Sequence, residues 1–461
     1  MNVTLLPAIE QLALLRNKKI SSPELAEEHI RQIERLNPLL NALVEFDAEK
    51  VRAQARQPKS GPLAGLPLTM KSSIEVKGYR CEIGSALNRG HLAHKDAEAV
   101  TRLSAAGATM LGTTNCPEFL MAYETDNLLY GRTSNPWSLE HSAGGSSGGE
   151  AAAIAAGLSA GGLGSDSGGS VRVPAHFCGI ASLKPTPCRV PGRGHRPRSA
   201  GPFSILGAVG PMARTIADVT LLFRNLFERD ALDPMSPPMG LREISYEDAK
   251  QIPIGWFEDD GLTPVTPETR QAVRDAAQAL ERQGFKVQPF RPKSLELARK
   301  LWWIFFVQCG EMSYGSTLKG REDQLSPIFQ EFLRLARAEK PLTAESLLGA
   351  WEECDLVRGR LQAEMKEFPV ILCPACAVPA FRHGEREWTV DGDTVGYWDA
   401  MRYTQWFNLF SSPAAVVPVG SSADGLPIGV QVAGRPFEDE MVLAVAEAFE
   451  REFGYRRPPV S

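Results

Sequence analysis

The sequence predicts an α/β protein: one large domain in which helices cover both faces of a mixed central β-sheet. Short apolar strand patterns such as GLPLTM (65–70) and ATMLG (108–112) alternate with helix-compatible stretches such as 96–107. The chain returns to strands near its end, with AAVVPVG (414–420) and GLPIGVQVAG (425–434). Strands that alternate with helices favour a mixed or parallel sheet covered by helices. The 461 residues, 43% hydrophobic and 23% charged, are enough to bury a large core.

The first sixty residues predict helices. Ser21 is a suitable N-cap, Pro23 fits a first helical turn, and Glu24 can complete a capping box with Ser21. Apolar residues then recur along the predicted helix: Leu25, Ile30, Ile33 and Leu36. We therefore expect N-terminal helices over 1–60.

The middle of the chain predicts a connection, a strand and a helix in that order. Residues 229–253 are rich in proline and acidic residues, which is typical of a surface connection. IPIGWF (252–257) predicts a strand, and Thr266 followed by Pro267 predicts the start of a helix that ends at Gly284.

Residues 295–368 are mostly helical in pattern, and a last helix carries one apolar face formed by Val442, Val445, Ala446 and Phe449. We expect a single domain over 1–461. Its core comprises 61–230 and 370–461, and a mostly helical elaboration occupies 231–369.

Composition excludes several classes of protein. A net charge of −5 gives no basic footprint for nucleic acid or for an acidic membrane surface. No 18-residue apolar window predicts a membrane span. The eight cysteines are scattered, and the C-x-x-C spacing of Cys373 and Cys376 has no second pair and lies in an apolar strand pattern. We therefore predict a reduced, cytoplasmic protein.

Two runs rich in glycine and serine, GGSSGGE (144–150) and GSDSGGSVRVPA (164–175), hold the main functional question. Neither run is followed by the lysine of a phosphate-binding loop, and Ser167 stands where a dinucleotide fingerprint needs its third glycine. Residues 144–148 match the G-x-S-x-G elbow of hydrolases, but NPWSLEHSA (135–143) does not predict the buried strand that must precede it. The downstream histidines, His176, His195 and His383, lie in no recognisable context.

A serine nucleophile activated by a neutral lysine fits these segments better. Lys71 ends an apolar strand pattern, and burial there would lower the pKa of its ammonium enough to make it a base. Gly168 and Gly169 precede Ser170 and would let backbone amides crowd towards a developing oxyanion. The alternatives are a solvated lysine at a strand end and glycines that serve only a tight turn.

The order of these motifs resembles the amidase signature family of serine hydrolases. Lys71 is followed by GGSSGG, then SDSGGSVRVPA, then LKPT (183–186). The resemblance covers most of 5–230 and 370–455, and it includes four further motifs: DAEAVTRLSAAGATMLGTTNCPEF (96–119), YGRTSNPW (130–137), GPMARTIADV (210–219) and GLPIGVQ (425–431). It implies the amidase signature fold, an enzyme that needs no metal or organic cofactor, and a variable, substrate-facing insert at 231–369.

The resemblance implies a role for each matching residue. Ser170 would be the acyl nucleophile, Ser146 the bridging serine after a cis peptide bond, and Lys71 the base. The remaining implied residues are an oxyanion hole formed by the amides of Ser167, Gly168, Gly169 and Ser170, and the supporting residues Ser147, Asp166 and Arg172. Two positions depart from the family: Ser72 replaces the usual aspartate after the lysine, and Thr113 replaces a common lysine.

The sequence leaves the substrate open, because a fold and a triad do not choose it. LWWIFF (301–306) concentrates Trp302, Trp303, Phe305 and Phe306, which could line a pocket or pack in the core. We predict an amidohydrolase that acts on non-peptide C–N bonds of small, hydrophobic or aromatic amides such as anilides, or of carbamates (urethanes). The alternatives are the glutaminase-type component of an amidotransferase complex, an esterase, and a non-catalytic binding protein. We leave a homodimer open.

Overall fold

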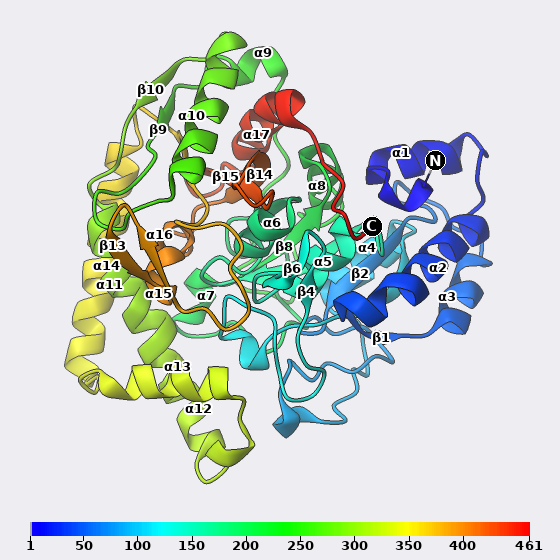
Figure 1. Ribbon diagram of the computed structural model, residues 1–461, viewed down its shortest axis with the longest axis horizontal. Coiled ribbons are helices and arrows are strands. Elements are labelled where there is room, and N and C mark those ends of the chain that lie inside the picture. The colour runs from blue at the N-terminus through cyan, green and yellow to red at the C-terminus, as the bar shows by residue number, and fades with distance from the viewer. Residues whose placement is uncertain (1) are drawn as a thin grey trace.

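The computed structural model describes residues 2–461, with the backbone alone at residue 316. An eleven-stranded sheet forms its centre (Figure 1). In spatial order its strands are β1 (Leu43–Phe46), β3 (Thr109–Thr114), β2 (Pro67–Lys71), β6 (Gly161–Asp166), β8 (Ala208–Ala213), β7 (Ala181–Lys184), β14 (Ala414–Ser421), β15 (Pro427–Gly434), β11 (Val370–Pro374), β9 (Ile254–Trp256) and β10 (Val287–Pro289). The sheet is mixed, as predicted: β2 runs parallel to β3 and β6, whereas β6 and β8 are antiparallel.

Helices cover both faces of this sheet, which confirms the predicted fold class. One face is covered by α1 (Ala8–Arg16), α4 (Glu98–Ala105), α8 (Ile216–Phe223), α10 (Pro267–Arg282) and α17 (Asp439–Phe453). The other face is covered by α2 (Ser22–Leu40), α3 (Ala48–Ala55), α5 (Gly148–Ala155), α6 (Arg172–Cys178), α11 (Leu295–Trp303) and α16 (Arg402–Leu409).

Alternation along the strands explains the two cores. In β11, Val370 and Leu372 pack against one helix layer, whereas Ile371 and Cys373 pack against the other. Successive side chains of a strand point to opposite faces, so a strand between two helix layers is apolar at most positions. Cys373 and Cys376 are both fully buried, which confirms the strand interpretation of that segment.

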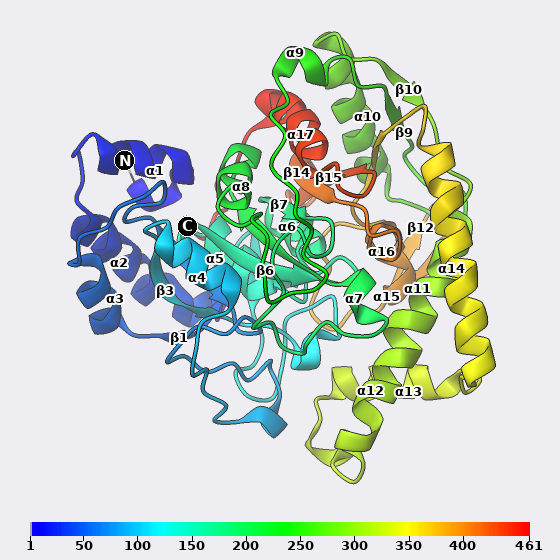
Figure 2. The same cartoon turned by 180° about the vertical axis from the view of Figure 1, so that it is seen from behind.

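The remaining elements are short or lie in the insert. They are α7 (Phe203–Leu206), α9 (Tyr246–Ala249), α12 (Cys309–Leu318), α13 (Pro327–Ala338), α14 (Ala344–Glu364) and α15 (Tyr397–Ala400), together with the hairpins β4 (Ser134–Asn135)–β5 (Ser138–Ser142) and β12 (Glu387–Val390)–β13 (Asp393–Gly396). Short 3₁₀-helices occupy Val3–Leu5, Ala86–Asn88, Glu118–Leu120 and Glu322–Gln324, and a π-helical turn, Ile304–Gln308, joins α11 to α12. Helices α12 and α13 extend away from the sheet (Figure 2).

Several predicted boundaries are confirmed. Ser21 caps α2 and forms the capping box with Glu24, and α10 begins at Pro267 after Thr266. One expectation was wrong in part: 138–142 forms β5, but this is a half-exposed hairpin strand rather than a buried strand leading into an elbow.

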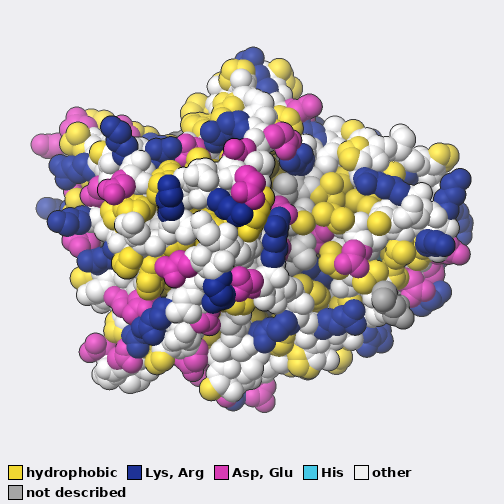
Figure 3. Space-filling view, turned by 90° about the horizontal axis from the view of Figure 1, so that it is seen from above, with side chains coloured by type: hydrophobic (Ala, Val, Ile, Leu, Met, Phe, Trp, Pro, Cys, Tyr) yellow, Lys and Arg dark blue, Asp and Glu magenta, His cyan; other side chains and the backbone are white. Residues whose placement is uncertain are grey.

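The segment 231–369 is not wholly outside the core, because β9 and β10 form one edge of the sheet. Its variability remains a prediction. Across residues 2–461, every helix falls short of the length or the apolar character that a membrane span requires. The face shown in Figure 3 intersperses basic and acidic side chains rather than gathering one sign of charge.

Candidate active site

Lys71 is the last residue of β2, and its side chain is completely buried. The strand runs in the middle of the sheet between β3 and β6, which places the Lys71 ammonium beneath the two serine-rich loops. Its Nζ lies 2.6 Å from Ser146 Oγ and 3.2 Å from Ser165 Oγ. The solvated-lysine alternative is therefore excluded by the structure.

Burial lowers the pKa of Lys71 to about 8, because an ammonium loses its hydration inside the protein. Within the described chain no carboxylate forms an ion pair with Lys71. Glu150 of α5 is a buried acid that accepts hydrogen bonds from Thr69 of β2 and Thr114 of β3. Burial nevertheless raises the pKa of Glu150 to about 8. Ser72, at the position where the family has aspartate, contacts Cys116 Sγ at 3.2 Å instead.

The first serine-rich loop needs its glycines for close packing. Gly144 has φ +80°, and a side chain at Gly145 would meet the backbone of Glu124 at 2.6 Å. The peptide bond between Gly145 and Ser146 is cis, as the resemblance implied. The next residue, Ser147, directly precedes α5 and bonds through its backbone N–H to the Ser170 carbonyl, which joins the two loops.

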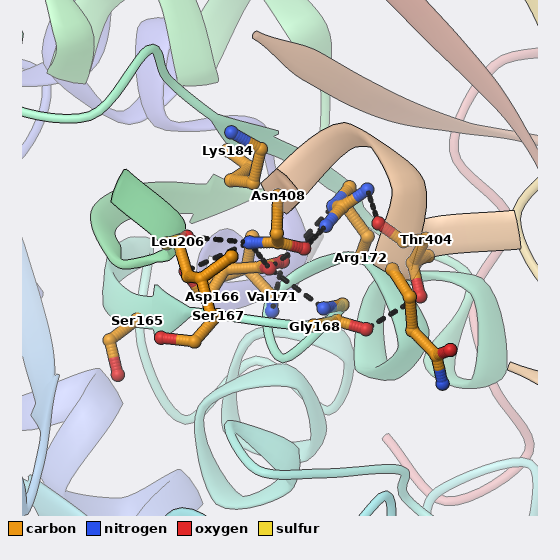
Figure 4. A network of polar contacts seen from close by, with 12 residues as sticks. Ser165, Asp166, Ser167, Gly168, Val171, Arg172, Lys184, Leu206, Thr404 and Asn408 are labelled. Atoms are coloured by element: carbon orange, nitrogen blue, oxygen red, sulfur yellow. Dashed lines mark hydrogen bonds and ion pairs between the residues drawn. The ribbon is translucent and has the colours of Figure 1, made fainter. Parts of the chain in front are cut away.

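The second serine-rich loop leaves β6 and enters α6, with Asp166 and Arg172 beneath it (Figure 4). Arg172 donates from Nη2 to Asp166 Oδ1 at 2.9 Å and from Nε to Asp166 Oδ2 at 3.0 Å, and both side chains are fully buried. Asn408 and Thr404 of α16 complete this network, which anchors the loop to a helix more than 230 residues away in sequence.

Burial alone would raise the pKa of Asp166, but the charge and hydrogen bonds of Arg172 outweigh it and hold that pKa well below its usual range. The carboxylate also accepts the backbone N–H of Gly169 at 2.7 Å and that of Val171 at 3.1 Å. A buried ion pair of this kind fixes the loop only while both partners remain charged.

We predict that Asp166→Asn lowers the free energy of unfolding by about 3–5 kcal/mol, because it leaves the buried Arg172 charge without a partner. Asp126→Asn is the matched control, since its ion pair with Arg132 is half-exposed and is worth about 1 kcal/mol or less. Denaturant unfolding monitored by circular dichroism measures both variants. Equal effects of the two substitutions would contradict the anchoring role.

The same pair has a pH dependence. Because the folded state depresses the pKa of Asp166, its stabilisation is present above the unfolded-state value near 4 and is lost as the pH falls below it.

The glycines before Ser170 lie against side chains on both sides. A side chain at Gly168 would meet Trp302 at 2.5 Å, and one at Gly169, where φ is +125°, would meet Thr404 at 2.3 Å. The indole of Trp302 donates to the Ser167 carbonyl at 3.0 Å. Among the described residues, the backbone amides of Ser167, Gly168 and Ser170 have no protein acceptor, whereas the amide of Gly169 is already bonded to Asp166.

The Ser170 side chain opens onto a cavity of about 310 Å³. Ser146, Ser165 and Ser167 share this cavity, but in the described chain no hydrogen bond joins the Ser146 and Ser170 hydroxyls. The apolar part of the wall is formed by Phe119, Leu120, Met121, Phe203, Phe306 and Tyr314.

The aromatic cluster of the insert divides between pocket and core. Phe306 lines the cavity, and Trp302 stacks on it with ring centres 4.6 Å apart. Trp302 and Phe305 are fully buried, the latter against Trp351 of α14, whereas Trp303 is partly exposed beside Arg299. Both interpretations of LWWIFF are therefore correct for different residues.

His195 lines the cavity, although its sequence context predicted no role for it. Its Nδ1 donates to the Pro197 carbonyl at 2.9 Å, so its Nε2 is the acceptor facing Ser73 at 3.2 Å. Burial and the nearby Lys71 charge lower the pKa of His195 to about 4. Only the folded chain could reveal it, because the signal is a contact between residues more than 120 apart.

Comparison with known proteins identifies the family of this chain. A sequence model described as Amidase matches residues 24–443. The chain is 33% identical to an acylamidase of Rhodococcus erythropolis over 97% of this chain and 96% of that protein. It is 31% identical to an indoleacetamide hydrolase of Bradyrhizobium diazoefficiens (97% and 86%). It is also 32% identical to the A subunit of the glutamyl-tRNA(Gln) amidotransferase of Roseiflexus castenholzii (95% and 94%).

Solved structures show the same architecture. A 6-aminohexanoate cyclic dimer hydrolase superposes with a TM-score of 0.87 at 29% identity, covering 99% of both chains. A bacterial aryl acylamidase superposes with a TM-score of 0.85 at 26% identity, covering 97% of this chain and 96% of that one. The fold and the site thus define a hydrolase that acts on the C–N bonds of amides. The chain belongs to the amidase family, the amidase signature enzymes.

Proposed function

We propose that this protein cleaves small, hydrophobic or aromatic amides such as anilides, or the corresponding carbamates, through a Ser170 acyl-enzyme. The observation that carries the proposal is the fully buried Lys71, whose Nζ lies 2.6 Å from Ser146 Oγ beside the cavity onto which Ser170 opens. A lysine that is neutral at mildly alkaline pH is a competent base, and burial supplies that neutrality here.

In the proposed first step, Ser146 passes its proton to neutral Lys71 and takes the proton of Ser170. The 2.6 Å separation between Nζ and Ser146 Oγ serves proton transfer in either direction. The freed Ser170 oxygen attacks the substrate carbonyl. The relay then returns a proton to the leaving nitrogen as the C–N bond breaks, and water cleaves the ester by the reverse route.

The oxyanion would be bound by the backbone amides at 167–170. Those of Ser167, Gly168 and Ser170 have no acceptor within the described chain, and that of Gly169 is bonded to Asp166. Removal of a single donor of this kind in other hydrolases costs roughly 3–4 kcal/mol of transition-state stabilisation. The role of Ser147 would be to hold the two loops together, since its hydroxyl contacts the backbone of Ser165 at 3.3 and 3.4 Å.

The apolar wall supports a hydrophobic or aromatic substrate. Phe119 and Phe306 face the same cavity as Ser170, and Tyr314 packs against Phe119 with ring centres 4.9 Å apart. Relatives named for acylamidase, indoleacetamide hydrolase and aryl acylamidase activities support the same class of amide. A likeness of equal extent to a component of a glutamyl-tRNA(Gln) amidotransferase keeps the glutaminase alternative open.

We expect wild-type protein alone to hydrolyse a phenylacetyl anilide, a phenyl carbamate of aniline, or both. It should hydrolyse free glutamine at least about tenfold less efficiently, because the apolar wall gives the charged α-amino and α-carboxylate groups of glutamine no partner. Release of aniline, followed by absorbance, and release of ammonia measure kcat/KM for each substrate. The ratio of anilide to carbamate reports which carbonyl the cavity prefers. Faster turnover of glutamine than of both aryl substrates would favour the amidotransferase alternative, and cleavage of phenyl acetate alone would favour an esterase.

A further inference from the structure

A second cavity, of about 320 Å³, adjoins the catalytic cavity. The two share six lining residues: Ser165, Ser167, His195, Arg198, Ser199 and Ala200. We call the segment 195–200 the shared wall. Ser165 and Ser167 lie on the side of Asp166 away from Arg172 (Figure 4), so the second cavity does not touch the ion pair that anchors the loop.

The shared wall lies on the Lys71 side of the site. Ser165 accepts a hydrogen bond from Lys71 at 3.2 Å, and the Lys71 charge is close enough to His195 to lower its pKa. A backbone hydrogen bond also joins the shared wall to the residues after β2, because Arg196 N–H donates to the Ser73 carbonyl at 2.7 Å. If the proposed function holds, the proton for the leaving nitrogen comes from Lys71 and Ser146. The leaving amine would then face this wall, and the acyl group would face the apolar wall of the catalytic cavity.

Arg198 is the one arginine or lysine that lines the catalytic cavity, and no carboxylate of the described chain pairs with it. The other arginine of the second cavity, Arg193, is already paired with Glu98 at 2.5 Å and with Asp230 at 2.9 Å. Asp233 lines only the second cavity, at the end formed by 232–235. The unpaired positive charge is thus at the shared wall, whereas Asp233 would repel an anion placed beside 232–235.

We propose that the shared wall is the subsite of the leaving amine and that Arg198 there recognises an anionic substituent on that amine. This proposal rests on the proposed function and narrows its substrate class to N-acyl amines that carry a carboxylate near the scissile bond, such as N-acyl aminobenzoates. A guanidinium suits a carboxylate because its planar fork can donate two parallel hydrogen bonds.

The test compares N-phenylacetyl-4-aminobenzoate with N-phenylacetyl-4-aminobenzamide, which has the same shape and no charge. We expect wild type to favour the carboxylate in kcat/KM by about tenfold, the low end for a hydrogen bond to a charged group, because Arg198 is exposed. Arg198→Gln should abolish the preference by lowering kcat/KM for the carboxylate about tenfold relative to kcat/KM for the neutral amide, and Arg198→Lys should keep part of it. Raising the salt concentration should shrink it.

Arg31→Gln is the matched control, because it removes the same charge from an exposed position on α2. It should keep the full preference. A mirrored pair that carries the carboxylate or the amide on the phenylacetyl ring tests the orientation. Three outcomes would overturn the proposal. Wild type could show no preference for the carboxylate, the preference could survive Arg198→Gln, or it could appear only for the carboxylate on the acyl side.

Binding of the intact amides to Ser170→Ala by calorimetry separates this proposal from the proposed function. Tighter binding of the aminobenzoate that is lost in Ser170→Ala/Arg198→Gln, without turnover by wild type, supports the subsite and refutes the hydrolase. Turnover without a charge preference refutes the subsite and keeps the hydrolase. If no member of the set is bound or turned over, both proposals are refuted.

Discussion

Ser170→Ala is expected to reduce kcat on an anilide by on the order of 10⁴-fold or more, because no other group can form the acyl-enzyme. The substitution should leave the fold intact. Ser170 Oγ faces the cavity and makes no hydrogen bond within the described chain, so its removal leaves no buried polar partner unsatisfied. Aniline release measures the activity and thermal unfolding checks the fold.

Ser147→Ala supplies the comparison within the same site. Its hydroxyl bridges the two loops through Ser165 and does not line the cavity, so we expect a loss of about tenfold or less. Retention of more than about one hundredth of wild-type activity by Ser170→Ala, with an acyl-enzyme still detectable by mass spectrometry, would show that another residue is the nucleophile.

Lys71→Ala is expected to cost about 10²–10⁴-fold in kcat, the usual contribution of a general base. The pH profile carries the sharper signature. Burial lowers the pKa of Lys71 to about 8, and only the neutral amine accepts a proton, so kcat/KM should rise with pH up to about 8 and level off above it. Below that pH the neutral fraction, and with it the rate, falls tenfold for each pH unit.

A second buried lysine provides the control for this assignment. Burial lowers the pKa of Lys184 to about 7, but its Nζ donates to the Pro185 carbonyl and does not reach the cavity. In Lys184→Met the rise near pH 8 should persist, whereas in Lys71→Ala the residual rate should lack it. If the rise near pH 8 were lost in Lys184→Met and kept in Lys71→Ala, the titrating group would be Lys184. The proposed relay would then have no base.

Local sequence signals predicted much of the fold because they do not depend on distant contacts. The capping box of Ser21 and Glu24 and the proline start of α10 act within one helical turn, and both formed as expected. Patterns with weak local signals were less reliable. Residues 138–142 form a strand only because the chain folds back onto Ser134, an interaction that no local pattern announced.

For the site, the sequence by itself determined the chemistry: which lysine, which serines and which glycines are present, and in what order. Only the tertiary structure decided their setting. The low pKa of Lys71 arises from burial between β3 and β6, and the anchoring of the Ser170 loop arises from Arg172 and its partners on α16. His195 and Arg198 likewise reach the cavity of Ser170 only in the folded chain, which brings 195–200 against Ser73. Residue types and local propensities are written along the sequence, whereas desolvation and long-range contacts exist only once the chain is packed.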